Sequence, residues 1–225
     1  MKLQNKNFQI SCDGGAATGK STGAKMISKK YKLKFLSSGL LYRYASYLII
    51  LHQPKNKVYF LKKKFKNLNY KKIERINLHT QEISKQSAII AKVNKIRQIL
   101  KKYQKNFSKK YKNCCLEGRD ISTKILPNSD VKFYFVCNLD TAARRRYKEL
   151  KKKNNKIKFE DVKKALRIRN KHDINRKNSP LLQHIDAIKI DTGKLNKQAM
   201  LIKMSKYVDR VIKKKYGNWT RIKKN

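Results

Sequence analysis

An eight-residue loop near the N-terminus constrains the fold of this chain more than any other feature of its sequence. Positions 14–21 are occupied by Gly14, Gly15, Ala16, Ala17, Thr18, Gly19, Lys20 and Ser21. This run fits G-x-x-x-x-G-K-[ST], the pattern of a phosphate-binding P-loop. Residues 8–12 before it are apolar enough for a short buried strand, and residues 22–31 after it favour a helix. Because a P-loop joins a strand to a helix, the sequence predicts an α/β fold that opens with this unit.

The residue types in the loop suit the phosphates of a nucleotide. Gly14 and Gly19 allow the backbone to curl until successive N–H groups point inward, and the following helix adds its positive dipole end. We expect Lys20 to contact the β- and γ-phosphates of ATP, and Ser21 to offer its hydroxyl to Mg²⁺. All eight loop positions and Thr22 are therefore candidate nucleotide-binding residues. The competing interpretation is a glycine turn before a helix, and 8 glycines in 225 residues make a chance match the weaker of the two.

Strand-like and helical patterns alternate along the rest of the chain. Strands are predicted at residues 8–12, 34–36, 114–117, 131–137 and 187–191. Helices are predicted at residues 22–31, 39–51, 80–106, 140–152, 159–173 and 195–215. Such alternation predicts a parallel sheet covered by helices on both faces, whose ligands sit at the carboxyl ends of the strands. We expect a single domain over 1–225, with the lysine-rich segments 55–72 and 151–158 outside its core.

The charge of the chain is extreme, with 59 Lys and Arg against 14 Asp and Glu and a formal net charge of +45. A nucleic-acid-binding protein that uses ATP as a switch is one explanation. The other is compositional drift, because Lys, Asn and Ile are all plentiful and the lysines are spread along the whole chain. We favour drift and expect no specific nucleic-acid partner, since no helix-turn-helix or aromatic stripe is recognisable.

Several other classes of protein are disfavoured. No run of about 18 apolar residues or N-terminal signal segment is present, so a cytoplasmic protein without a membrane partner is expected. The four cysteines show no C-x-x-C spacing and are expected to be reduced and buried. The four histidines form no ligand pair, which argues against a zinc site.

Arginine is scarce, yet it is concentrated in a few clusters. Only 12 of the 59 basic residues are arginine. Nine of them lie near other candidate site residues, namely Arg43, Arg97, Arg119, Arg144, Arg145, Arg146, Arg167, Arg169 and Arg176. The planar guanidinium grips phosphate oxygens in pairs, which an ammonium group does not do. Drift toward lysine should spare those arginines whose fork is required, so these clusters indicate phosphate chemistry.

Four clusters beyond the P-loop carry a resemblance to a known family. They are Ser37-Ser38-Gly39-Leu40-Leu41-Tyr42-Arg43, Thr80-Gln81-Glu82 with Arg97, Glu117-Gly118-Arg119-Asp120, and Arg169, Asp173 and Arg176 with Ser179-Pro180-Leu181. Together with Asp13-Gly14, and in this order, they resemble bacterial cytidylate kinases over residues 8–215. The resemblance implies a five-stranded parallel P-loop kinase core, with a nucleoside-monophosphate lobe near 44–79 and a lid near 144–160. It also implies transfer of a phosphoryl group from ATP to CMP or dCMP, by a monomer.

The resemblance also implies roles for individual residues. The acceptor site would comprise Ser38, Tyr42, Arg43, Arg97, Arg119, Asp120, Arg169, Asp173 and Arg176. Of these, Arg43, Arg119 and Arg176 would hold the acceptor phosphate. Arg97 and Asp120 would contact the cytosine, and Arg169 and Asp173 the sugar. The catalytic residues would be Lys20, Arg119, Arg176 and the lid residue Arg146.

Two departures from the family pattern leave alternatives open. A serine that helps to recognise cytosine in relatives falls on Ala88 here, with Ser87 one place earlier. A kinase for UMP or another small phosphorylated acceptor is therefore the alternative function. The segment between Arg43 and Thr80 is short, so a β-rich insert found in longer family members is expected to be trimmed.

Asp13 and Glu117 either hold waters of Mg²⁺ or cap strand ends.

Overall fold

The computed structural model describes residues 6–152 and 155–217. The extreme ends of the expected domain 1–225 and positions 153–154 of the expected lid lie outside the described residues. The chain divides into two compact units. The first contains the described residues up to Phe35 and from Lys112 onward, and the second is Leu36–Tyr111.

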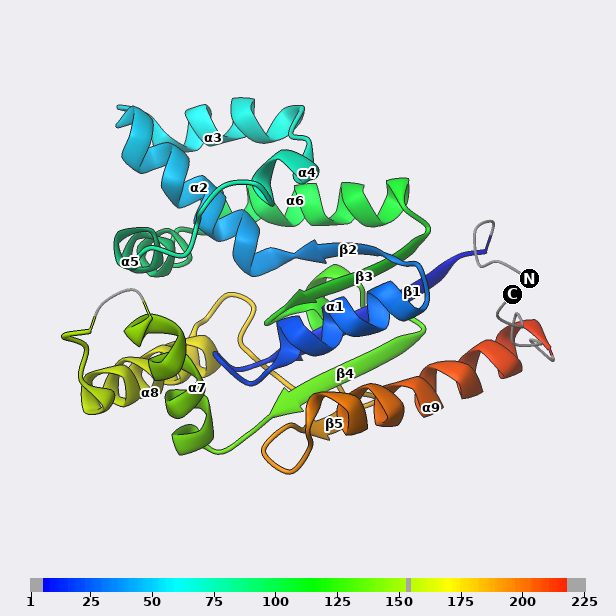
Figure 1. Ribbon diagram of the computed structural model, residues 1–225. Coiled ribbons are helices and arrows are strands. Elements are labelled where there is room, and N and C mark those ends of the chain that lie inside the picture. The colour runs from blue at the N-terminus through cyan, green and yellow to red at the C-terminus, as the bar shows by residue number, and fades with distance from the viewer. Residues whose placement is uncertain (1–5, 153–154, 218–225) are drawn as a thin grey trace. The chain divides into compact units, whose positions relative to one another are not determined.

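The sheet that carries the P-loop belongs to the first unit, except for the last two residues of its strand β2, Leu36 and Ser37 (Figure 1). Its strands are β1 (Phe8–Gly14), β2 (Lys34–Ser37), β3 (Asn113–Gly118), β4 (Val131–Val136) and β5 (Ile188–Asp191). They follow the order β2-β3-β1-β4-β5, and the pairs β1–β3, β1–β4 and β4–β5 are parallel. The predicted fold class is therefore confirmed. In the observed register Cys12 lies opposite Glu117, so β1 and β3 end beside each other, next to the P-loop.

Two helices, α1 (Lys20–Lys30) and α9 (Lys197–Tyr216), lie along the sheet (Figure 1). They pack together and bury apolar side chains against it. The core contains Phe8 and Ile10 of β1, Phe133 and Phe135 of β4, and the α9 residues Met200, Met204, Val208 and Ile212. The apolar stripe predicted for residues 195–215 thus lies on the core side of α9. The hairpin of α7 (Leu139–Lys151) and α8 (Phe159–Asn175) packs around a smaller cluster that includes Ala16 of the P-loop.

The close approach of α1 to the sheet leads to a prediction for Gly23. A Cβ atom at this position would lie 2.7 Å from Cε1 of Phe135 and 3.3 Å from Sδ of Met204. Because the Phe135 ring is fully buried and cannot swing away, Gly23→Ala should lower the free energy of unfolding by about 1–3 kcal/mol. Thermal or urea unfolding measures this effect. Gly39→Ala is the matched control, since its new Cβ meets nothing closer than 3.7 Å and should not destabilise the protein.

The second unit is helical and corrects the interpretation of residues 55–72. Its helices are α2 (Ser38–His52), α3 (Lys57–Lys66), α4 (Tyr70–Ile73), α5 (Gln81–Ile90) and α6 (Asn94–Lys110). Asn56 and Asn69 cap α3 and α4 with their side-chain oxygens, which starts both helices locally. Leu61 and Phe65 on α3 are buried, so this segment, which was expected to lie outside the core of a single domain, forms part of the core of the second unit. The lysines obscured the apolar spacing, because they occupy the exposed face of α3.

The single helix expected over 80–106 is also wrong, because α5 ends at Ile90 and α6 begins at Asn94. The backbone amides of Lys92 and Val93 close tight turns by donating to the carbonyls of Ile89 and Ile90. Arg97 reaches back across this break, and its Nη1 donates to the carbonyl of Ala91 at 3.4 Å. No glycine or proline marks the break, so local sequence signals do not reveal it.

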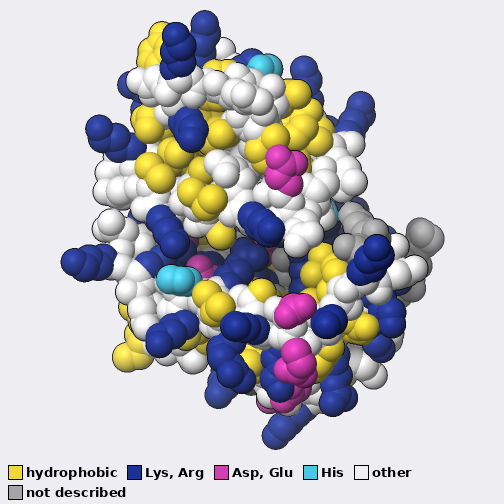
Figure 2. Space-filling view, turned by 90° about the vertical axis from the view of Figure 1, so that its left-hand side faces the viewer, with side chains coloured by type: hydrophobic (Ala, Val, Ile, Leu, Met, Phe, Trp, Pro, Cys, Tyr) yellow, Lys and Arg dark blue, Asp and Glu magenta, His cyan; other side chains and the backbone are white. Residues whose placement is uncertain are grey.

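The basic surface residues are scattered. Figure 2 shows Lys and Arg side chains spread over the visible face, separated by polar and apolar surface. This distribution is what compositional drift predicts for that face. Within the two described stretches, no helix combines the length and the apolar character that are needed to cross a bilayer.

Candidate active site

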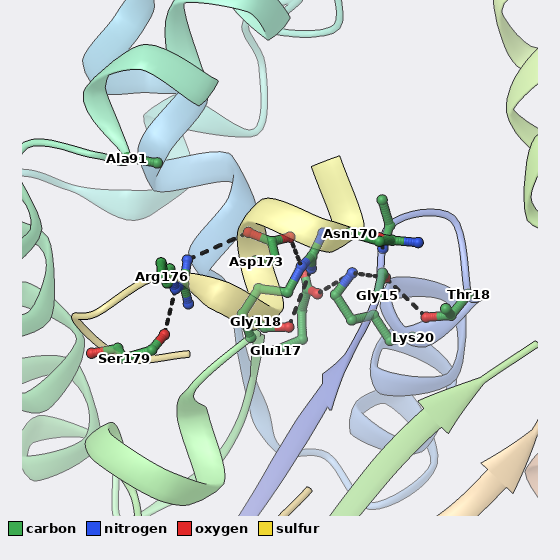
Figure 3. Close-up of polar contacts among 12 residues, drawn as sticks. Gly15, Thr18, Lys20, Ala91, Glu117, Gly118, Asn170, Asp173, Arg176 and Ser179 are labelled. Carbon is green, nitrogen blue, oxygen red and sulfur yellow. Dashed lines mark hydrogen bonds and ion pairs between the residues drawn. The ribbon is translucent and has the colours of Figure 1, made fainter. Parts of the chain in front are cut away.

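The P-loop follows the central strand and adopts a strained curl. Gly19 has φ 78° and Ala17 has φ 58°, both in the left-handed region. A Cβ atom at Gly14, where φ is 153°, would lie 2.4 Å from the carbonyl oxygen of Phe135. Inside the loop, Oγ1 of Thr18 donates to the carbonyl of Gly15 at 3.1 Å (Figure 3). Glycine is therefore required at position 14 by the neighbouring strand, as well as by the turn.

Side chains distant in sequence fix the loop from outside, and sequence reasoning missed two of them. The amide of Ala16 donates to Oδ1 of Asn170 on α8 at 3.1 Å. The hydroxyl of Thr192 donates to the carbonyl of Thr18 at 2.8 Å. Arg145 on α7 donates in turn to the hydroxyl and the carbonyl of Thr192, at 2.8 and 2.7 Å. The available signals were the place of Asn170 directly after Arg169 and that of Thr192 directly after the last strand.

Lys20 is the first residue of α1, and its side chain is almost completely buried, with 7% of the residue exposed. Its Nζ donates to the carbonyl of Gly15 at 3.2 Å and lies 3.9 Å from Oε2 of Glu117 (Figure 3). Burial, together with the nearby charge of Arg119, lowers the pKa of Lys20 to about 7, and the charge of Glu117 opposes this shift only partly. A bound anion at this position would stabilise the ammonium form.

This pKa predicts how nucleotide binding depends on pH. Without ligand, Lys20 loses its proton as the pH rises through about 7. Because a bound phosphate favours the charged form, binding of ADP above that pH requires proton uptake, and the affinity should fall as the pH rises from about 7 to about 9, by up to about tenfold per unit. Calorimetric titrations over this range measure it. Lys20→Arg stays charged and should give a flat profile, whereas a flat wild-type profile would contradict the assignment.

Two arginines and an aspartate form a second cluster at the carboxyl end of β3. Nε of Arg119 donates to Oδ2 of Asp173 at 2.8 Å, and Nη1 of Arg176 approaches Oδ1 of Asp173 at 3.5 Å (Figure 3). Nε of Arg176 also donates to the carbonyl of Ser179, which has a positive φ of 56°. Burial alone would raise the pKa of Asp173, but the charges of Arg119, Arg169 and Arg176 hold it below its usual value. The carboxylate therefore aligns two cationic forks near the P-loop lysine.

Asp13 serves as a cap in this structure. Its Oδ1 accepts from the amide of Ile121 at 2.8 Å, and its Oδ2 accepts from the amide and the hydroxyl of Ser122 at 2.7 and 2.6 Å. These contacts begin a π-helical segment, Ile121–Ile125, directly after the buried residue Asp120. Burial raises the pKa of Asp13, and the hydrogen bonds oppose this only partly. Of the two interpretations of Asp13, the structure therefore supports the cap.

The oxygen atoms near the P-loop suit a magnesium ion that arrives with a nucleotide better than they suit a permanently bound metal. Within residues 6–152 and 155–217, no three His, Cys, Asp or Glu side chains group together as a metal site. Mg²⁺ commonly takes one or two protein oxygens together with substrate phosphates and water. The exposed Ser21 at the start of α1, and the buried Glu117 near Lys20, supply oxygens of that kind.

The remaining first-unit candidates lie on the hairpin. Arg146 on α7 bonds Glu149 three residues further along the same helix, at 3.0 Å. Such an exposed pair contributes little to stability, so the guanidinium can exchange partners at small cost. Arg169 on α8 is exposed, and its positive charge contributes to lowering the pKa of both Lys20 and Asp173. The structure therefore brings Lys20, Glu117, Arg119, Asp173 and Arg176 together, whereas Arg146 lies on a separate helix.

The second unit holds the other candidates. Ser38 is buried at the start of α2, and the guanidinium of Arg97, a residue that is only 3% exposed, lies 5.9 Å from the centre of the Tyr42 ring. Nη1 of Arg43 donates to the carbonyl of Leu78 at 3.0 Å and to the hydroxyl of Ser84 at 2.7 Å. These contacts fix α2 against the start of α5.

Ser87 and Ala88 of α5 have different surroundings. Ala88 is exposed on α5, whereas Ser87 is buried and donates to the carbonyl of Ser84 at 2.8 Å. The hydroxyl of Ser87 is thus used inside its own helix and lies on a different face from Ala88. This helix therefore presents no hydroxyl group at position 88.

The family model and the related sequences agree on one family. The family model described as "Cytidylate kinase" matches residues 10–210. A cytidylate kinase of Bartonella tribocorum is 35% identical over 213 residues, which cover 92% of this chain and 97% of that protein. A cytidylate kinase of Rickettsia canadensis is 33% identical over 208 residues, covering 91% and 93%.

Among solved structures, an uncharacterized protein from Eubacterium ventriosum matches with a TM-score of 0.53. The two sequences are 15% identical, and the match covers 91% of this chain and 99% of the other. This likeness concerns the fold alone.

Proposed function

This chain belongs to the cytidylate kinase family, a family of nucleoside monophosphate kinases, and from that premise we propose that it transfers the γ-phosphoryl group of ATP to CMP or dCMP. The products would be ADP and CDP or dCDP. One observation carries the proposal most directly: the buried Lys20 of the P-loop lies in one cluster with Glu117, Arg119, Asp173 and Arg176. Such a cluster can hold two anionic groups close together and cancel their repulsion.

The donor side of the proposed reaction belongs to the P-loop. Its backbone amides and the ammonium group of Lys20 would bind the β- and γ-phosphates of ATP, with Thr22 completing the loop. Ser21 would bind Mg²⁺, with Glu117 next to it through water, and the ion would neutralise phosphate charge there. Arg146 would contact the transferring group after exchanging its exposed partner Glu149.

The acceptor phosphate would bind the guanidinium groups of Arg119 and Arg176, with Arg43 as a third contact. The acceptor oxygen is already anionic at pH 7, so the reaction needs no general base. Rate enhancement then comes from alignment and charge neutralisation. Asp173 contributes by orienting Arg119 and Arg176, and together with Arg169 it would contact the sugar.

Arg97 and Asp120 would contact the cytosine, and Ser38 and Tyr42 would also line the acceptor site. The amino group, N3 and O2 of cytosine offer one donor and two acceptors, which a carboxylate and a guanidinium complement. The exposed Ala88 and the internally bonded Ser87 favour a second candidate, in which UMP or another small phosphorylated acceptor is also used. That the chain acts as a monomer, in the cytoplasm and without a nucleic-acid partner, stays a prediction.

A panel of acceptors tests the proposal. ADP formation is followed in a coupled assay with CMP, dCMP, UMP, AMP and shikimate, each at the same concentration. The proposal expects CMP or dCMP to give the highest kcat/KM, and a comparable rate with UMP would favour the second candidate. If no pyrimidine monophosphate accelerates ADP formation, the assignment is wrong.

A further inference from the structure

The P-loop amide of Ala16 already has a partner from outside the loop. It donates to Oδ1 of Asn170 on α8 at 3.1 Å. The same oxygen lies 3.3 Å from the place where a Cβ atom of Gly15 would be. The carboxamide of Asn170 therefore lies directly against the Gly15–Ala16 segment, and Figure 3 shows Asn170 next to Gly15.

This contact engages a group that a donor phosphate needs. P-loop amides bind phosphate oxygens through their N–H groups, and each N–H donates one hydrogen bond. Ala16 is only 5% exposed and packs with Ala142, Ala143 and Leu166 of the α7–α8 hairpin, which holds this part of the loop beside α8. A phosphate oxygen and Oδ1 of Asn170 thus compete for the same hydrogen.

The helix that carries Asn170 also carries the aspartate of the arginine cluster. Asn170 and Asp173 are three residues apart on α8 and share one face of it. One of these side chains bonds the P-loop, and the other bonds Arg119. A change in the Asn170 contact would therefore act on the helix that orients the acceptor-side arginines.

We infer that Asn170 is a positioning residue that holds the amide of Ala16 in the nucleotide-free enzyme and is displaced by a phosphate of the donor. The inference rests on the proposed function, in that it takes the P-loop as the donor site. Because breaking the contact opposes binding, Asn170 lowers the affinity for the donor and couples its arrival to α8.

Two substitutions at one position separate this role from others. Asn170→Ala removes the competing oxygen and should tighten ADP binding about threefold to tenfold in calorimetric titrations. Asn170→Asp keeps the acceptor oxygen and adds a negative charge, so it should weaken ADP binding by a similar or larger factor. The exposed Asn175 on the same helix provides matched controls, and Asn175→Ala and Asn175→Asp should change the affinity less than twofold.

An amide readout makes the test independent of catalysis. The ¹⁵N–¹H resonance of Ala16 in wild-type protein should move on addition of ADP, and in Asn170→Ala it should be displaced before any ADP is added.

Weaker ADP binding in both Asn170 variants would make Asn170 a phosphate ligand and overturn the inference. Unchanged affinity in both would also overturn it. Failure of the wild type to bind ADP would reject the donor site itself, whereas failure in the acceptor panel alone would leave this inference standing.

Discussion

Replacing Lys20 by alanine is expected to lower kcat by about a hundredfold to a thousandfold in the coupled assay. The ammonium group donates to the loop carbonyl of Gly15 and lies near Glu117, so it is held at the start of α1 where phosphate charge would develop. Removing it leaves that charge to the backbone amides and the arginines. The loss should appear in kcat, because the contact strengthens as the phosphoryl group transfers, and also in the KM for ATP, because the ammonium form favours nucleotide binding.

The same variant should remain folded. The pKa of Lys20 is lowered to about 7, mainly by burial, which means that the folded state disfavours the charged form of this side chain. Deleting the charge therefore removes a contribution that destabilises the folded state. Thermal unfolding and circular dichroism check this point. Lys29→Ala, an exposed lysine in the last turn of the same helix, should keep full activity. A Lys20→Ala enzyme with a kcat near that of the wild type would reject Lys20 as the phosphate contact.

The second large effect is expected at the paired arginines. Arg119→Lys and Arg176→Lys should each lower kcat/KM for the nucleoside monophosphate by about tenfold to a hundredfold. Nε of Arg119 donates to Asp173 and its Nη1 donates to the carbonyl of Gly118 at 3.3 Å, whereas Arg176 bonds both Asp173 and the carbonyl of Ser179. A lysine carries all its donors on one nitrogen, so it cannot reproduce the planar, spaced contacts of a guanidinium that bonds Asp173 on one side and a phosphate on the other.

Steady-state kinetics with the acceptor varied at saturating ATP measure this effect, and the KM for ATP should change much less. Arg210→Lys on the exposed side of α9 is the matched control, since that guanidinium lies over the ring of Tyr207. Equal losses for donor and acceptor would point to general damage instead of a specific acceptor contact.

Much of the fold was accessible from the sequence, because its signals are local. The P-loop pattern and the apolar runs predicted β1, the neighbouring strands and the stripe on α9, and the parallel sheet is confirmed. The break between α5 and α6 was missed because Arg97 and tight turns make it, without glycine or proline. The helix α3 was missed because lysines occupy its exposed face.

The candidate site was likewise predictable only where its residues belong to local sequence patterns. Lys20, Arg119 and Arg176 follow recognisable patterns, and the structure places them near one another through Asp173 and Glu117. Their roles toward substrates remain predictions. Asn170 and Thr192 were not foreseen, because each reaches the loop from a remote part of the chain, and such contacts leave no periodic trace in a sequence.

Because Gly15 lies against Asn170, the residues that can be tolerated at these two distant positions depend on each other. The P-loop pattern permits any residue at position 15, but here a methyl group would press against the carboxamide of Asn170. Homologues with a bulkier residue at the first of these sites should carry a shorter side chain at the second. The two positions are therefore expected to covary, although neither is fixed by the motif itself.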